Sequence, residues 1–181
     1  NTSPLFALIS FIEKYEDWKE KLKSPPYCIR VKQHELWPSR YIFSYNMIDT
    51  QWDKDPLTLA CRGTILDVKT ENNKRIVIPV CVPFYKFFNY GESNAVTIDW
   101  NSAYIREKID GSLIKLYYDD NVNEWRFATN NGFDCYTQLP GFPIINKEIG
   151  NDGKTFYDLV NFALKQVHWD IHLQTLQEKI I

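Results

Sequence analysis

The sequence predicts an α+β fold in which antiparallel sheets are flanked by helices. Apolar residues recur at helical spacing near both ends of the chain, and β-rich runs separated by polar turns fill the middle. The chain has 181 residues, of which 44% are hydrophobic and 15% aromatic, enough for a sizeable core. Helices at the ends with antiparallel hairpins between them are typical of the α+β class.

The first predicted element is a helix over residues 4–22. Ser3 can cap it, Pro4 suits its first position, and Pro25-Pro26 ends it. Its apolar residues share one face, and charged residues fill the other, which we expect to be solvated. The apolar set is Leu5, Leu8, Ile9, Ile12, Tyr15, Trp18 and Leu22.

Strands are predicted next, over residues 28–33, 40–46, 60–67 and 75–82. The last two form a hairpin around the polar turn Thr70-Glu71-Asn72-Asn73. A second hairpin is expected from residues 104–109 and 113–118 around Asp110-Gly111, because both turn residues tolerate a positive φ. Residues 124–129 are predicted to pair with residues 113–118 across the turn at residues 119–123. Residues 130–153 are predicted to be loop-rich, and residues 155–180 to form one helix or a helix with a break.

Composition excludes several classes of protein. The net charge of −2 gives no global basic field, so an RNA partner would need a local basic cleft. No apolar run approaches the roughly 18 residues of a membrane span, and no phosphate-binding P-loop is present. Four cysteines, interpreted as reduced thiols, add to this and lead us to expect an intracellular, cytoplasmic protein.

Metal sites are not expected. Cys28, Cys61, Cys81 and Cys135 are far apart and form no C-x-x-C pair, which indicates reduced, mostly buried thiols. His168 and His172 have the spacing of two ligands on one helix face, but no third ligand lies on that face.

The segment Lys108-Ile109-Asp110-Gly111 has two interpretations. It can be an ordinary hairpin turn beside an incidental lysine. Alternatively, the Lys108 amine attacks the α-phosphate of a nucleotide and forms a lysyl-AMP phosphoramide. That chemistry needs a neutral amine, with Arg62, Lys86 and Mg²⁺ as the candidate neighbouring cations. It also needs close backbone approach, which Gly111 permits, and Mg²⁺ and basic side chains for the developing phosphate charge.

Three further blocks precede this segment. They are Phe43-Ser44-Tyr45-Asn46, Ala60-Cys61-Arg62-Gly63-Thr64-Ile65-Leu66-Asp67 and Tyr85-Lys86-Phe87-Phe88-Asn89-Tyr90-Gly91-Glu92. In order and spacing, these blocks with Lys108-Ile109-Asp110-Gly111-Ser112-Leu113 resemble the adenylyltransferase domain of RNA ligases of the phage T4 RNA ligase 1 type. The resemblance covers roughly residues 40–130. It implies a covalent nucleotidyltransferase (ligase and capping enzyme) fold.

The resemblance also implies residue roles. Lys108 is the expected catalytic nucleophile that takes AMP. The expected ATP-binding residues are Tyr45, Arg62, Lys86, Phe88, Glu107, Asp110 and Gly111, with Glu107 the looser match, as a reader of adenine. Taken singly, each of these residues could instead be structural.

The implied function is ATP-dependent RNA ligation with Mg²⁺, in which AMP passes to an RNA 5′-phosphate that is then joined to a 3′-hydroxyl, as in RNA repair. Two alternatives stay open: a non-catalytic nucleotide- or RNA-binding remnant, and another nucleotidyltransferase such as a DNA ligase or capping enzyme. Asn131 stands where the family can carry a basic residue. The later Glu blocks and Lys-x-Lys are not found after Lys108, so we expect residues 1–181 to be the N-terminal part of a longer domain that adenylates poorly alone.

Overall fold

The computed structural model describes residues 3–136 and 155–169. The chain divides into two compact units, Asn1–Leu113 and Ile114–Ile181. Each unit combines antiparallel strands with helix, so the predicted α+β class is confirmed.

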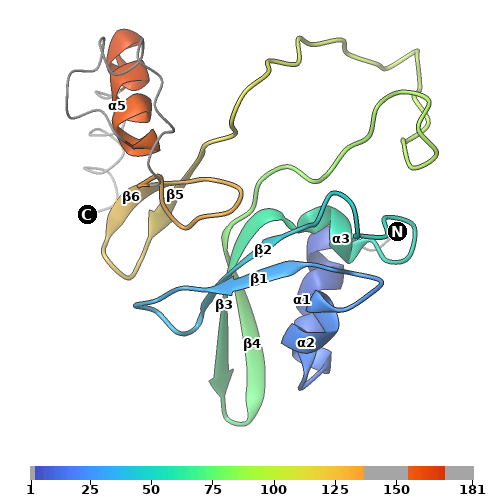
Figure 1. Ribbon diagram of the computed structural model, residues 1–181, viewed down its shortest axis with the longest axis vertical. Helices are drawn as coiled ribbons and strands as arrows, with labels where there is room; N and C mark the ends of the chain where they lie inside the picture. The colour runs from blue at the N-terminus through green and yellow to red at the C-terminus, as the bar shows by residue number, and fades with distance from the viewer. Residues whose placement is uncertain (1–2, 137–154, 170–181) are drawn as a thin grey trace. The chain divides into compact units, whose positions relative to one another are not determined.

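The first unit is built on a four-stranded antiparallel sheet of order β1-β2-β3-β4 with three helices (Figure 1). Its elements are α1 (Pro4–Lys14), α2 (Trp18–Lys23), β1 (Arg30–Gln33), β2 (Arg40–Ser44), α3 (Leu57–Ala60), β3 (Arg62–Glu71) and β4 (Lys74–Cys81). All four strands were predicted to within a few residues, whereas the short helix α3 was not predicted.

The β3–β4 hairpin forms around a two-residue turn. Asn72 and Asn73 have φ values of 51° and 60°, and Glu71 pairs with Lys74 across them. Two consecutive positive φ values are the requirement of the tight hairpin turn that matches the twist of the strands, and Asn tolerates them. The predicted polar turn is therefore confirmed and located at its last two residues.

The helix predicted over residues 4–22 is interrupted. α1 ends at Lys14, and α2 begins at Trp18. Arg75 of β4 donates from Nη1 to the carbonyl oxygens of Ile12 (2.7 Å) and Tyr15 (2.8 Å), so a residue distant in sequence binds the last turn of α1. Free carbonyls at a helix end favour such a cation, which explains a break that apolar spacing does not reveal.

The core of the first unit lies between the helices and one face of the sheet. Its buried apolar members are Leu8, Ile12, Trp18, Leu22, Ile29, Tyr41, Phe43, Leu57, Ala60, Cys61, Leu66 and Val77. Residues of β2 that alternate with Tyr41 and Phe43 are also buried, and among them Arg40 forms a bidentate ion pair with Asp67 of β3 (2.9 and 3.1 Å). This pair fixes the register of the two central strands.

The hairpin predicted around Asp110-Gly111 is wrong. Residues 82–114 contain no helix or strand, and of the two turn residues only Gly111 has a positive φ (137°). The type I′ hairpin turn that Asp-Gly favours needs a positive φ at both positions. Tyr104, Ile105 and Ile109 remain 89%, 92% and 82% exposed, so no second strand covers them.

The second unit contains the hairpin β5 (Lys115–Asp119) and β6 (Glu124–Ala128), followed by α5 (Phe156–Gln166). Thr155 and Asp158 form a reciprocal capping box at the start of α5, which explains why the helix begins there. The predicted helix over residues 155–180 is thus confirmed over its first part, and its part beyond residue 169 lies outside the described residues.

Candidate functional site

Four of the eight predicted site residues meet at one end of the four-stranded sheet. Tyr45 directly follows β2, Arg62 begins β3, and Lys86 and Phe88 lie in the segment after β4. Two backbone hydrogen bonds join these parts: Tyr45 N–H donates to Cys61 O (2.7 Å), and Lys86 N–H donates to Leu59 O (2.9 Å). The sheet therefore brings together residues that are up to 43 positions apart in the chain.

An aromatic cluster forms the centre of this end. The ring of Trp52 is edge-to-face with Tyr45 (centroids 4.9 Å apart, interplanar angle 77°) and with Phe88 (5.7 Å, 78°). The Lys86 ammonium lies 4.8 Å from the Phe88 centroid and 5.8 Å from that of Trp52, and it donates to Phe87 O (2.9 Å). Phe88 thus belongs to the cluster, whereas its neighbour Phe87 is 49% exposed.

Arg62 lies beside this cluster on a separate pair of rings. Its guanidinium carbon is 4.1 Å from the Phe84 centroid and 5.8 Å from that of Phe87. Its Nη1 is buried and has no hydrogen-bond partner. Stacking positions the planar guanidinium but satisfies none of its in-plane N–H donors. A buried donor of this kind is suited to an oxygen of an anionic ligand.

A small cavity of about 190 Å³ adjoins the Lys86 side of the cluster. It is lined by Leu59, Lys86, Phe87, Phe88, Tyr90, Asn94, Ala95, Val96 and Ile98. Most of these side chains are apolar, and Lys86 and Asn94 supply polar groups. Such a mixture is typical of pockets that hold an organic ligand by its apolar part and orient it with few polar contacts.

The other four predicted residues are placed separately. Glu107, Lys108, Asp110 and Gly111 are exposed, and Lys108 Nζ is 3.6 Å from Asp110 Oδ1. No hydrogen bond, ion pair or ring contact of the described residues joins residues 107–111 to Tyr45, Arg62, Lys86 or Phe88. A Cβ added at Gly111 would meet no atom within 4 Å. In this arrangement the Lys108 amine has open space around it.

Two residues of the site were missed by sequence reasoning. Trp52 and Phe84 make the ring contacts that hold Tyr45, Phe88 and Arg62 in place. Phe84 lies three positions before Phe87, and both rings meet the same guanidinium, a spacing that could have drawn attention to it. Trp52 lies in an irregular loop, where no periodicity points to its partners.

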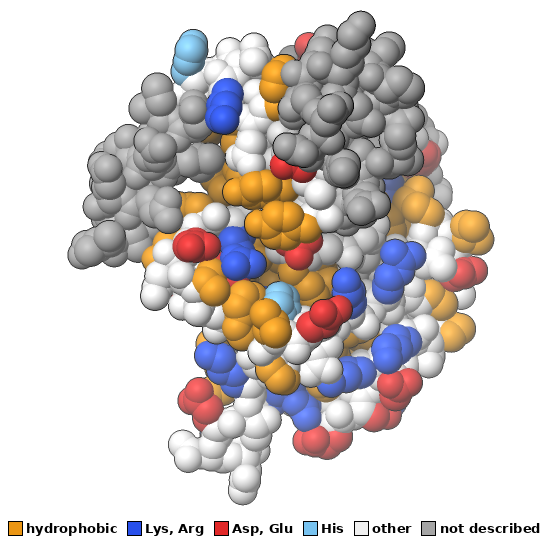
Figure 2. All heavy atoms as spheres, turned by 60° about the vertical axis from the view of Figure 1, so that its left-hand side comes forward, with side chains coloured by type: hydrophobic (Ala, Val, Ile, Leu, Met, Phe, Trp, Pro, Cys, Tyr) orange, Lys and Arg blue, Asp and Glu red, His pale blue; other side chains and the backbone are white. Residues whose placement is uncertain are grey.

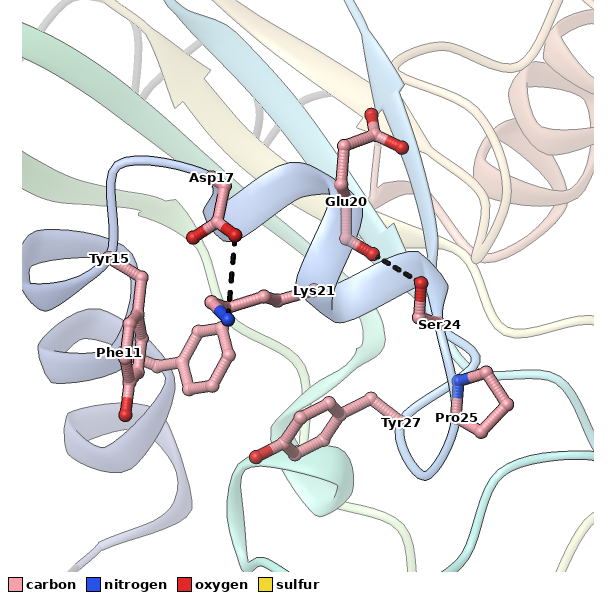
Figure 3. Close-up of a pocket in the computed structure, with 8 residues that line it drawn as sticks. All are labelled: Phe11, Tyr15, Asp17, Glu20, Lys21, Ser24, Pro25 and Tyr27. Atoms are coloured by element: carbon pink, nitrogen blue, oxygen red, sulfur yellow. Dashed lines mark hydrogen bonds and ion pairs between the residues drawn. The ribbon is translucent and has the colours of Figure 1, made fainter.

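A second hollow of about 440 Å³ lies between α1, α2 and the loop after α2 (Figure 3). Its lining residues are Phe11, Tyr15, Asp17, Glu20, Lys21, Ser24, Pro25 and Tyr27. Lys21 pairs with Asp17 (3.4 Å) and lies 5.2 Å from the Tyr15 centroid. The cation that packs against the aromatic rings of this hollow is therefore the chain's own Lys21. None of the predicted site residues lines the hollow.

The cysteines and the possible metal ligands form no reactive or metal-binding group among the described residues. The four cysteines are free, as expected, and burial raises the pKa of the Cys61 thiol above its usual range and that of Cys135 to about 11. Among residues 3–136 and 155–169, no three His, Cys, Asp or Glu side chains are grouped to hold a metal ion. His172 lies outside these residues.

Charges of both signs share the surface. Figure 2 shows basic and acidic side chains interspersed with apolar ones over one face, as the net charge of −2 leads us to expect. No helix in the described part of the chain has the length and apolar character needed to cross a membrane.

The chain matches none of the protein-family models and none of the curated proteins.

Proposed function

We propose that this chain carries the nucleotide-binding part of an ATP-dependent RNA ligase with a covalent nucleotidyltransferase fold, acting inside the cell. The observation that carries the proposal is Arg62, whose stacked guanidinium has a buried Nη1 without a partner, beside Tyr45, Lys86 and Phe88. A buried unsatisfied N–H costs about 1–3 kcal/mol, so its presence here favours a ligand that satisfies it. A triphosphate supplies the oxygen atoms, and the aromatic cluster supplies rings against which a base can pack.

In this proposal Lys108 is the nucleophile. Its Nζ, once deprotonated, attacks the α-phosphorus of ATP, an N–P bond forms, and pyrophosphate leaves with the electrons of the broken P–O bond. AMP then passes to the 5′-phosphate of an RNA and restores the free lysine. A 3′-hydroxyl finally attacks the activated phosphate, so that a phosphodiester forms and AMP is released.

Magnesium would neutralise charge on the phosphates. In this proposal Mg²⁺ reaches the site on the triphosphate of ATP. The chain's own contribution is the placement of Arg62 and Lys86 for the phosphates. Lys108 must approach this end of the sheet. Its ion pair with Asp110 lies within the segment, and no other hydrogen bond, ion pair or ring contact of the described residues holds residues 107–111 back.

The test uses the protein expressed from its complete gene and ATP labelled at the α-phosphate. We expect a covalent AMP adduct that Lys108→Ala abolishes and that Lys69→Ala, which removes an exposed lysine of β3, leaves intact. An adduct that persists in Lys108→Ala would place the nucleophile elsewhere. An adduct with GTP alone would indicate a capping enzyme.

A second candidate, a non-catalytic nucleotide-binding protein, is favoured by one observation. The Lys108 side chain is 67% exposed. No hydrogen bond, ion pair or ring contact of the described residues joins it to the four clustered residues. This candidate predicts that ATP binds, that Arg62→Ala weakens the binding, and that no covalent adduct forms under any condition.

A further inference from the structure

Trp52 lies at the centre of the aromatic cluster, although no motif marks it. It is half-buried in the loop between β2 and α3. Its two edge-to-face partners come from different parts of the chain, Tyr45 from the end of β2 and Phe88 from the segment after β4. The rings of Tyr45 and Phe88 thus both contact the same indole.

The loop that carries Trp52 is itself held by hydrogen bonds. Asn46 accepts at Oδ1 from Ile48 N–H (2.9 Å), and its own N–H donates to Thr50 Oγ1 (3.0 Å). Gln51 N–H donates to Pro26 O (3.0 Å), which ties the residue before Trp52 to the loop after α2. The backbone leading up to Trp52 is therefore held by hydrogen bonds that do not depend on a ligand.

The segment that carries Phe88 has less support of its own. Residues 82–114 contain no helix or strand, and near Phe88 the one backbone tie to the rest of the unit is Lys86 N–H to Leu59 O. The contact with Trp52 fixes the Phe88 ring against a well-held loop. It also provides a second aromatic neighbour for the Lys86 ammonium.

We propose that Trp52 is a positioning residue for the nucleotide: it holds the Tyr45 and Phe88 rings and the Lys86 ammonium in one arrangement and thereby sets the affinity for ATP. This inference rests on the proposed function. Binding groups whose geometry is locked by packing lose less freedom when a ligand arrives, so an unlocked set binds more weakly. Trp52 acts through its neighbours and takes no part in the covalent steps.

The experiment measures lysyl-AMP formation by the protein from its complete gene as ATP concentration is varied. We expect Trp52→Ala to raise the KM for ATP about tenfold, because two aromatic pairs are lost, and to change the rate at saturating ATP little. Trp52→Phe keeps a ring at the position and should restore most of the affinity. Should Trp52→Ala not fold, Trp52→Leu fills the space without an aromatic ring and takes its place.

Trp37→Ala is the matched control. Trp37 is half-buried like Trp52 and contacts His34 (4.2 Å) and Arg40 (5.3 Å) in the connection between β1 and β2, so its loss removes a comparable tryptophan without touching the cluster. Its KM for ATP should stay at the wild-type value. Equal KM increases in Trp37→Ala and Trp52→Ala would show general destabilisation and would overturn the inference.

The remaining outcomes separate the two claims. Wild-type adduct formation with an unchanged KM in Trp52→Ala overturns the role of Trp52 and leaves the proposed function standing. A wild-type protein that forms no adduct with any nucleotide overturns the proposed function and this inference together.

Discussion

At the scale of single residues, Arg62 is well packed but leaves a buried hydrogen-bond donor unsatisfied, a combination not expected of a side chain that serves only the fold. Its guanidinium is held by the faces of Phe84 and Phe87, yet its buried Nη1 has no partner. A residue retained only for stability would be expected to pair that donor or to be apolar. In the proposed function, a phosphate oxygen of the bound nucleotide would satisfy this donor.

This combination leads to a prediction for Arg62→Met. Methionine can pack against the same rings without a buried donor, so we expect the free energy of unfolding to rise by about 1 kcal/mol. If the proposed function holds, adenylation should be lost in the same variant, because the group proposed to bind phosphate is gone. Urea denaturation followed by tryptophan fluorescence measures the first effect and α-labelled ATP the second. Clear destabilisation by Arg62→Met would show that Arg62 serves the fold.

At the scale of elements, the central strands β2 and β3 are joined by a buried ion pair. Arg40 is 1% exposed and Asp67 8% exposed, and they make two hydrogen bonds. Because both charges lose their hydration, a buried ion pair adds little net free energy of folding. Removal of one partner is nevertheless destabilising, because the other charge stays buried without its counter-ion. The pair thus enforces one register more than it adds free energy.

We therefore predict that Asp67→Ala lowers the free energy of unfolding by about 3–5 kcal/mol. The double variant Arg40→Met with Asp67→Leu should recover most of this loss, since no charge remains buried. Denaturant titration of both variants measures the difference. Glu20→Gln, which breaks the exposed pair with Lys23, is the control and should have little effect. A double variant as unstable as Asp67→Ala would contradict the argument.

The elements also show which features local sequence can predict. The β3–β4 hairpin has its turn residues and alternating apolar residues within one short stretch, and it was predicted well. The break after α1 depends on Arg75, which binds the Ile12 carbonyl from 63 positions away. The hairpin at Asp110-Gly111 was predicted wrongly for a related reason: the turn signal was present, but the residues after it, β5, pair with β6 instead.

In the candidate site, too, some residues could be predicted from local sequence and others could not. Tyr45, Arg62, Lys86 and Phe88 could be proposed from motifs, because a motif preserves residue type and spacing. Trp52 could not, because its role consists of ring contacts with residues 7 and 36 positions away. Such contacts are properties of the tertiary structure.

At the scale of the whole chain, residues 82–113 are a long part of the first unit with few structural ties. They contain no helix or strand, and their apolar side chains Tyr104, Ile105 and Ile109 are almost fully exposed. Few buried contacts and few backbone hydrogen bonds allow local opening at low free energy. In the proposed function, this is the property that would let Lys108 reach the residues held at the end of the sheet.

This leads to the last prediction, for limited proteolysis. Arg106 and Lys108 lie in this exposed stretch, so trypsin should cleave there well before it cleaves at Lys69 or Lys74 in the β3–β4 hairpin. Mg²⁺ and ATP should slow the cleavage after Lys108 in the wild-type protein. An adenylated lysine has lost its positive charge and carries a bulky nucleotide, so the specificity pocket of trypsin does not accept it. Lys108→Ala should still be cut after Arg106 at the same rate with and without ATP. Mass spectrometry of the early fragments identifies the sites. First cleavage within β3 or β4 would show that residues 103–113 are protected and that Lys108 does not belong to an accessible segment.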